Sequence, residues 1–80
     1  MVYIKTSDDI VKKRQAIISK MVQVRLEKGL SQMELAKLTG MHRSNIFRVE
    51  SGRHNISIDT LIRVFDALGK DLSIKLKDKG

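Results

Sequence analysis

The chain has 80 residues, of which 41% are hydrophobic, and this length and composition fit one small folded domain. Its net charge is +7. It contains no cysteine for a disulfide or a thiolate metal site, and no apolar run approaches the ~20 residues that a membrane span needs. The first residues lack the apolar stretch of a signal peptide, so we expect a cytoplasmic protein without a membrane partner. The positive charge favours nucleic acid as a partner, although many soluble domains also carry a few excess lysines.

A long helix is predicted in the first third of the chain, after a short β-prone run at Val2–Lys5. Ser7 can cap this helix, and Asp8 and Asp9 place negative charge near the positive end of its dipole. We expect the helix to continue to Lys28 and to stop at Gly29. Its broad apolar face is predicted from residues with near-helical spacing: Ile10, Ile17, Ile18, Met21, Val22, Val24 and Leu26.

The next predicted helix has a strong start signal. Ser31 and Glu34 have the spacing of a capping box, in which the hydroxyl accepts from a backbone N–H and the carboxylate reaches back to the cap residue. Leu35, Ala36 and Leu38 supply a narrow apolar face, and the small Ala36 lets another helix cross closely.

A tight turn and a further short helix follow. Gly40 can adopt the positive φ that ends one helix, and the next helix is predicted from about Arg43 to Glu50 with Ile46 and Val49 on its apolar side. Two helices joined by a glycine turn are typical of a helix-turn-helix motif, whose second helix enters the DNA major groove.

A fourth helix and a change of period complete the pattern. Ser57 caps the helix, Asp59 lies in its first turn, Gly69 ends it, and its inward stripe is predicted as Ile58, Leu61, Phe65 and Leu68.

The tail alternates apolar and polar residues, which predicts a half-buried strand at about 71–77 containing Leu72, Ile74 and Leu76. Such a strand needs a neighbour: the Val2–Lys5 run, the same strand of a second subunit, or a partner protein. The alternative is a frayed basic tail that pairs with nothing.

The motif residues resemble the XRE family of phage-repressor-like helix-turn-helix proteins. The resemblance runs from Ile17 to Gly69 and is carried by RLEKGLSQMELAKLTG at 25–40 and IFRVESGR at 46–53. It implies a lambda-repressor-like, all-α DNA-binding domain with four main helices, a single domain over 1–80 with its core at 17–69. A C-terminal strand is more similar to the HigA-like and HipB-like antitoxin branch, whose members are dimeric regulators that also bind a toxin.

A helical wheel predicts which residues of the second motif helix contact bases. With Ile46 and Val49 buried, the opposite side carries Arg43, Ser44, Phe47 and Arg48. Arginine can form a fork with guanine, and the phenyl ring can contact a thymine methyl group. Outside such a motif, exposed arginines are usually only solvated, and Phe47 could instead fold back over the core edge or contact another protein.

A second set is expected to contact phosphates, which sets binding register rather than sequence preference. It consists of Gln32, His42, Asn45, Arg53, His54 and Asn55, placed at helix starts and in the loop after the motif. By resemblance to the phage repressors, Arg25 and Glu50 form a partly buried ion pair that holds the recognition helix to the first helix. The alternative is that Arg25 and Glu50 are ordinary surface charges.

No catalytic constellation, cofactor motif or metal-ligand spacing is present, so we expect neither an enzyme nor a metal or cofactor site. The predicted function is sequence-specific DNA binding by a homodimer on a palindromic double-stranded operator, as a repressor, with the antitoxin of a type II toxin–antitoxin pair as a further possibility. Such a protein would be nucleoid-associated when bound. The alternatives are a module that mainly neutralises a cognate toxin and a coactivator that bridges transcription proteins.

Overall fold

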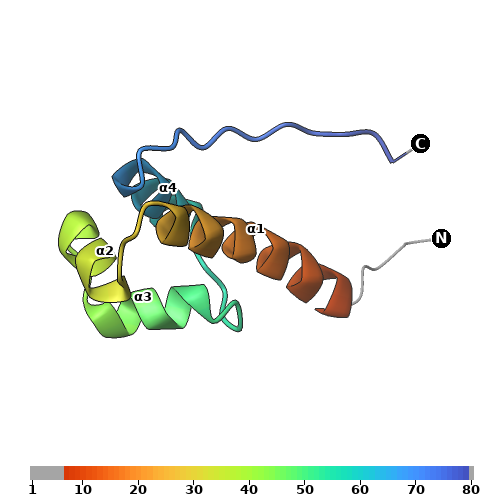
Figure 1. Cartoon of the computed structure of the whole chain (residues 1–80). Helices are drawn as coiled ribbons and strands as arrows, with labels where there is room; N and C mark the ends of the chain where they lie inside the picture. Colours follow the sequence, from red (N-terminus) through yellow and green to blue (C-terminus); the bar gives the residue numbers. More distant parts are fainter. Residues whose placement is uncertain (1–6, 80) are drawn as a thin grey trace.

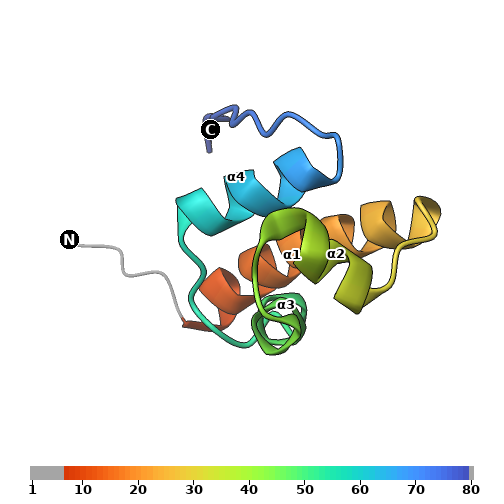
Figure 2. The same cartoon turned by 90° about the vertical axis from the view of Figure 1, so that its left-hand side faces the viewer.

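A computed structural model describes residues 7–79, which form four helices: α1 Ser7–Glu27, α2 Gln32–Thr39, α3 Arg43–Glu50 and α4 Ile58–Ala67. The long α1 runs through the molecule, with α3 on one side of it and α4 on the other (Figure 1). Helix α2 packs against both α3 and α4 near the C-terminal end of α1, as the turned view also shows (Figure 2). The predicted all-α fold with a helix-turn-helix is confirmed.

The core is aliphatic except for one phenyl ring. All four helices contribute buried side chains, which are Ile18, Met21, Val24, Leu35, Ala36, Ile46, Val49, Val64, Phe65 and Leu68. Met21, Leu35, Ile46, Val64 and Leu68 are fully buried. The best-covered residues thus include one from α3 itself, and Ile46 anchors that helix among the side chains of the other helices.

Several residues of the predicted apolar faces lie in solvent instead. The exposed fractions of Ile10, Ile17 and Leu26 on α1 are 51%, 44% and 61%, and those of Leu38 and Ile58 are 58% and 52%. Helical spacing identifies an apolar side, but only the stripe under a neighbouring helix is covered. The first helix also ends at Glu27, one residue before the predicted end.

The predicted signals at both ends of α2 and at the start of α4 are confirmed, whereas Ser7 is the first residue of α1 and not the residue before it. The backbone N–H of Glu34 donates to Ser31 Oγ at 3.0 Å, and the Ser31 N–H donates to Glu34 Oε1 at 2.9 Å. Gly40 adopts φ +72°, and Ser57 Oγ accepts from the Thr60 N–H at 3.0 Å. Because the Ser31 backbone N–H and then its side chain hydrogen-bond the Glu34 carboxylate, the pKa of Glu34 lies below its usual value.

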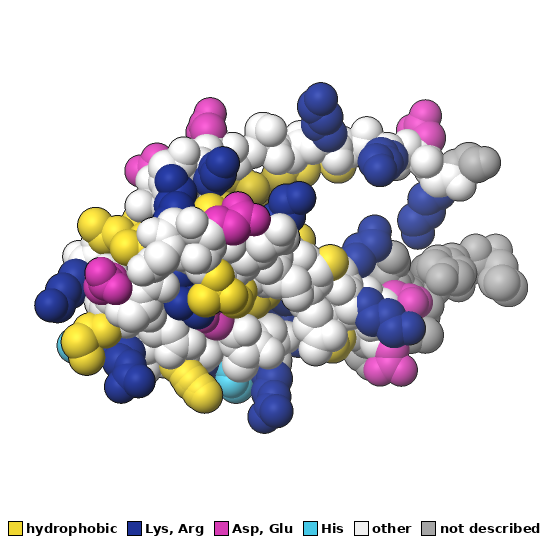
Figure 3. Space-filling view, in the orientation of Figure 1, with side chains coloured by type: hydrophobic (Ala, Val, Ile, Leu, Met, Phe, Trp, Pro, Cys, Tyr) yellow, Lys and Arg dark blue, Asp and Glu magenta, His cyan; other side chains and the backbone are white. Residues whose placement is uncertain are grey.

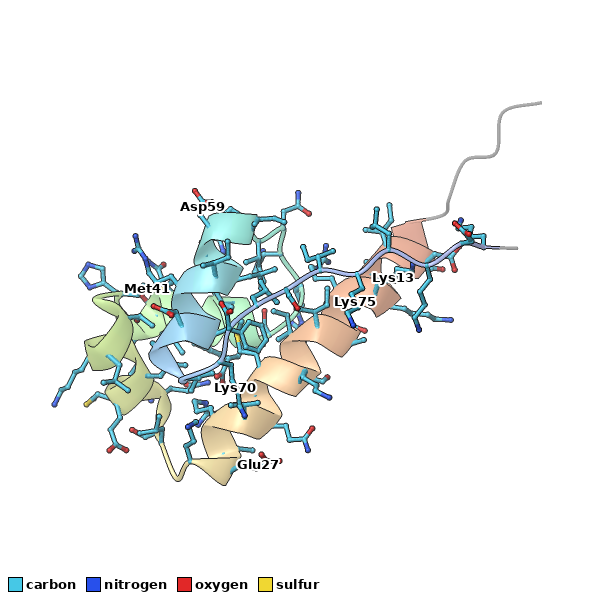
Figure 4. The ribbon with its side chains drawn as sticks, turned by 90° about the horizontal axis from the view of Figure 1, so that it is seen from above. Lys13, Glu27, Met41, Asp59, Lys70 and Lys75 are labelled. Carbon is cyan, nitrogen blue, oxygen red and sulfur yellow. The ribbon has the colours of Figure 1, made fainter. Side chains whose placement is uncertain are left out.

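The predicted C-terminal strand is wrong: residues 70–79 form no strand within the described range 7–79. They run back along α1 toward its N-terminal end, with Lys70 and Lys75 over that helix in the view from above (Figures 1 and 4). Leu72 packs against the core, whereas Ile74 and Leu76 are 64% and 94% exposed.

The alternating pattern satisfies the side-chain rule for a strand, but a strand also needs backbone partners. None of the described segments hydrogen-bonds the backbone of residues 71–78. The other β-prone run, Val2–Lys5, lies outside the described residues. No helix within residues 7–79 combines the length and apolar character needed to cross a membrane.

Candidate nucleic-acid interface

Helix α3 has one buried and one open side. Ile46 and Val49 are 1% and 8% exposed, and they fix the orientation of the helix on the core. The four residues predicted to contact bases all lie in solvent: Arg43, Ser44, Phe47 and Arg48. In the space-filling view, basic, hydrophobic and histidine side chains gather along the edge formed by α3 and its neighbouring loops (Figure 3).

The aromatic residue in this set does not fold into the core. The Phe47 side chain is 56% exposed and lines a shallow hollow together with Gln32, Arg43 and Ser44. The hollow therefore combines an apolar wall with cationic and hydroxyl groups. This combination suits the major-groove edges of bases, which present both hydrogen-bonding atoms and the thymine methyl group.

His42 occupies the N-cap position of α3, with extended φ and ψ of −71° and 147°, but its side chain makes no capping hydrogen bond. Its backbone carbonyl accepts from the N–H groups of Asn45 and Ile46. The imidazole is exposed beside the start of α3. Asn45 is also exposed, on the flank of the helix.

The loop after α3 carries the other expected phosphate contacts, since Arg53, His54 and Asn55 are all exposed there. Ser51 organises the beginning of this loop: its Oγ donates to the carbonyl of Arg48 at 2.7 Å and accepts from the Arg53 N–H at 3.3 Å. The loop thus presents the side chains of Arg53, His54 and Asn55 from a turn that the hydrogen bonds of Ser51 stabilise.

Gln32 is half-buried at the first position of α2, and its Nε2 donates to Glu50 Oε1 at 3.0 Å. A side-chain amide has two N–H groups, so one donor remains for another acceptor. The structure therefore shows a hydrogen bond from Gln32 to α3 that the sequence pattern did not predict.

The structure brings Arg25 and Glu50 together in a two-pronged ion pair. Arg25 Nε lies 2.7 Å from Glu50 Oε2, and its Nη2 lies 2.9 Å from Oε1, with side-chain exposures of only 10% and 6%. Arg25 Nη1 also donates to the Leu30 carbonyl at 2.8 Å. The pair joins α1, the α1–α2 turn and the end of α3.

Arg14 is a residue that the sequence pattern did not single out. Its Nε donates to the Gly52 carbonyl at 2.9 Å, and its Nη1 lies 3.4 Å from Asn55 Oδ1. A signal was present, because Arg14, Ile18, Met21 and Arg25 recur at helical spacing along one stripe of α1. A half-buried arginine in line with core residues is a candidate for a contact with another segment.

Within residues 7–79, no group of three or more histidine, cysteine, aspartate or glutamate side chains is placed to hold a metal ion. The groups gathered around α3 are hydrogen-bond donors, cations and one aromatic ring. Donors and cations of this kind are the groups that contact phosphate oxygens in protein–DNA complexes.

Comparisons with known proteins agree with this geometry. Residues 21–75 match the helix-turn-helix family model. An uncharacterized HTH-type transcriptional regulator from Haemophilus influenzae is 38% identical over 61 residues, which cover 76% of this chain and 62% of that relative.

A chain in the toxin–antitoxin module from Streptococcus pneumoniae shares the fold with a TM-score of 0.71 and 31% identity, covering 94% of this chain and 85% of that chain. The family match extends over the whole motif, over α4 and over the last part of α1. This chain therefore belongs to the helix-turn-helix family, and its motif is of the XRE type.

Proposed function

We propose that this protein is a sequence-specific DNA-binding regulator of transcription that acts as a repressor. The observation that carries the proposal is the open side of α3, where Arg43, Ser44, Phe47 and Arg48 are exposed while Ile46 and Val49 anchor the opposite side in the core. The similarity to an HTH-type transcriptional regulator supports the same function.

In this proposal the open side of α3 enters the major groove. Arg43 and Arg48 form forks with guanine O6 and N7, Ser44 donates or accepts, and Phe47 contacts a thymine methyl group. The phosphate contacts come from two segments that flank α3, with Gln32 on one side and the exposed loop residues Arg53, His54 and Asn55 on the other. His42 and Asn45 add contacts along the helix itself.

The operator should be a palindrome bound by a homodimer. Helix α3 has eight residues and is about 12 Å long, so one copy reaches only a few base pairs. Two copies related by a two-fold axis place their helices in successive major grooves, with half-sites about 34 Å apart or a multiple of that distance. Bound to an operator, the protein would be located with the nucleoid in the cytoplasm.

A second role is favoured by one specific observation, the similarity of this fold to a chain of a toxin–antitoxin module. We propose that the protein can also act as an antitoxin, with a small toxic protein as its partner. The two roles are compatible, because an antitoxin can repress its own promoter. A protein-binding role as the main function, with DNA binding secondary, is the competing proposal.

Selection of bound sequences from a random double-stranded DNA pool tests the proposed function. We expect enrichment of one symmetric motif, and a control pool recovered with an Arg43→Ala/Arg48→Ala variant should lose that enrichment while retaining some salt-sensitive binding. Failure of the wild-type chain to enrich any sequence at low salt would overturn sequence-specific binding. Capture of a neighbouring gene's product without DNA enrichment would instead favour the protein-binding alternative.

A further inference from the structure

Arg14 of α1 hydrogen-bonds the loop that follows α3. Arg14 Nε donates to the Gly52 carbonyl at 2.9 Å, and Arg14 Nη1 lies 3.4 Å from Asn55 Oδ1. These two acceptors lie on either side of Arg53 and His54 in the sequence. The guanidinium therefore fixes both ends of the short segment that carries the exposed basic side chains.

The loop also rests closely on the neighbouring residue of α1. Gly52 is buried, and a Cβ built on it would lie 3.2 Å from Gln15 Cγ. Contact at Gln15 and hydrogen bonds from Arg14 come from the same turn of α1. The loop therefore packs against that turn of α1, and its position depends on α1 rather than on α3 alone.

The orientation of the Asn55 amide follows from the same contact. Because Asn55 Oδ1 faces the Arg14 guanidinium, the Nδ2 group is left with its two N–H donors for other acceptors. Asn55 is exposed, so these donors face solvent. A surface that offers donors from Asn55 beside the cation of Arg53 matches phosphate oxygens, which only accept hydrogen bonds.

Helix α1 holds the other side of the motif in a similar way. Arg25 lies on the same stripe, about three helical turns and roughly 16 Å from Arg14. It binds Glu50, which in turn accepts from Gln32 at the start of α2. One rigid helix therefore carries two arginines, each of which fixes one of the two segments that flank α3.

We propose that Arg14 is a positioning residue for DNA binding. It fixes the position of the 53–55 loop, and α1 sets the distance between the two phosphate-contacting segments. This inference rests on the proposed function, since it concerns the same DNA surface. Arg14 acts through Asn55 and Arg53 and makes no phosphate contact of its own.

The test compares variants that separate charge from geometry. Arg14→Gln removes the charge and the fork, and Arg14→Lys keeps the charge but not the planar fork. Lys13→Gln removes an adjacent charge from an exposed side chain. We expect Arg14→Gln to weaken binding to specific and random DNA alike by about ten- to a hundredfold. Arg14→Lys should lose more affinity than Lys13→Gln, although only the latter loses a charge.

A double-mutant cycle identifies the route of the effect. In a background that already carries Arg53→Ala, His54→Ala and Asn55→Ala, adding Arg14→Gln should cause no further loss of affinity, because the side chains it positions are gone. Additive losses would overturn the proposal, since they would show an independent contact of Arg14 with DNA. Equal affinities for Arg14→Gln and Lys13→Gln would also overturn it by showing a general charge effect.

A measurement without DNA keeps the inference separate from the proposed function. Amide hydrogen exchange at Arg53, whose N–H donates to Ser51 Oγ, should become faster in Arg14→Gln and stay unchanged in Lys13→Gln, with equal helical circular dichroism in both. Unchanged exchange in Arg14→Gln would contradict the positioning role even if DNA binding were established. Faster exchange in a protein that binds no DNA would instead refute the proposed function, but it would still show that Arg14 fixes the position of the loop.

Discussion

The side-chain amide of Gln32 donates a hydrogen bond to Glu50 Oε1 at 3.0 Å, which joins the first residue of α2 to the last residue of α3. Arg25 from α1 binds the same carboxylate through two nitrogens. Both ends of the helix-turn-helix unit are therefore closed by one buried polar cluster. A residue expected to contact phosphate is held in place before any DNA arrives, which lowers the ordering cost of binding.

The first prediction concerns this cluster. Arg25→Ala removes the cation and leaves the Glu50 carboxylate, whose side chain is 6% exposed, without its main partner. We expect the free energy of unfolding to fall by roughly 3–5 kcal/mol, as is usual when one member of a buried ion pair is deleted. Urea denaturation followed by circular dichroism measures the loss, and the exposed Lys20→Ala on the same helix is the matched control.

A loss below about 0.5 kcal/mol, the range of ordinary surface substitutions, would show that the pair does not hold α3 to α1. Replacing both partners, as Arg25→Met with Glu50→Leu, should recover part of the stability because no charge is then stranded. The recovery should be incomplete, since the Leu30 carbonyl and the Gln32 amide lose their partners as well.

The second prediction compares two glycines with positive φ. Gly40→Ala should cost about 1–2 kcal/mol from backbone strain alone, because φ is +72° and nothing lies within 4 Å of the new Cβ. Gly52→Ala combines a similar strain, at φ +69°, with a 3.2 Å approach to Gln15 Cγ, and should cost about 1 kcal/mol more. Thermal unfolding of both variants measures the difference.

Truncation of the contacted side chain provides the control for this comparison. In a Gln15→Ala background the Gly52→Ala variant should lose only the strain component and approach the cost of Gly40→Ala. If both glycine variants are equally destabilised with Gln15 present, the close contact between the loop and α1 carries no energy.

The third prediction is a pH dependence at the start of α2. The hydrogen bonds from Ser31 lower the pKa of Glu34 in the folded chain, so the ionised carboxylate stabilises the native state at neutral pH. Because the folded-state pKa is depressed, this stabilisation is present above the unfolded-state pKa and is lost as pH falls through the folded-state pKa.

Wild type should therefore be more stable than Glu34→Gln at pH 7, and the gap should close in acid. Thermal midpoints measured between pH 7 and pH 2 check this, with Glu27→Gln as the control because Glu27 accepts from the exposed Gln23 side chain rather than from a helix-capping group. A gap that stays constant with pH would mean that ionisation of Glu34 does not contribute to capping.

The fourth prediction separates phosphate contacts from general charge. Arg53→Ala should weaken binding to every DNA sequence and reduce the slope of log K against log salt by about 0.9, the value for one lost phosphate contact. Lys70→Ala removes the same charge from the opposite side of α1, where Figure 4 shows Lys70 over that helix, and should leave the slope nearly unchanged. Equal slopes for the two variants would remove Arg53 from the phosphate-contacting set.

Features that depend on a few neighbouring residues could be predicted from the sequence. The capping box of Ser31 and Glu34 and the left-handed Gly40 are of this kind, because cap and turn geometry is decided within four residues. The buried side of α3 was also predictable, since only Ile46 and Val49 in that helix combine apolar character with a shared face.

Features that depend on a distant neighbour could not be predicted in the same way. Ile17 and Ile18 are adjacent and chemically identical, yet one is 44% exposed and the other 2%, because only one lies under the packed helices. The alternation of Ile74 and Leu76 describes side chains but supplies no backbone partner, so it predicted a strand where the chain has none. The contact of Arg14 with Gly52 needed the path of the loop between α3 and α4.

The central claim is that the open side of α3 determines which DNA sequence is bound. The most direct test repeats the random-pool selection with Arg48→Ala, beside Lys70→Ala as a control of equal charge. We predict that Arg48→Ala loses base preference at one symmetric pair of positions, with a discrimination loss of about 1–3 kcal/mol there, while the rest of the motif and the control motif stay unchanged. A wild-type motif recovered with both Arg48→Ala and Arg43→Ala would contradict the claim.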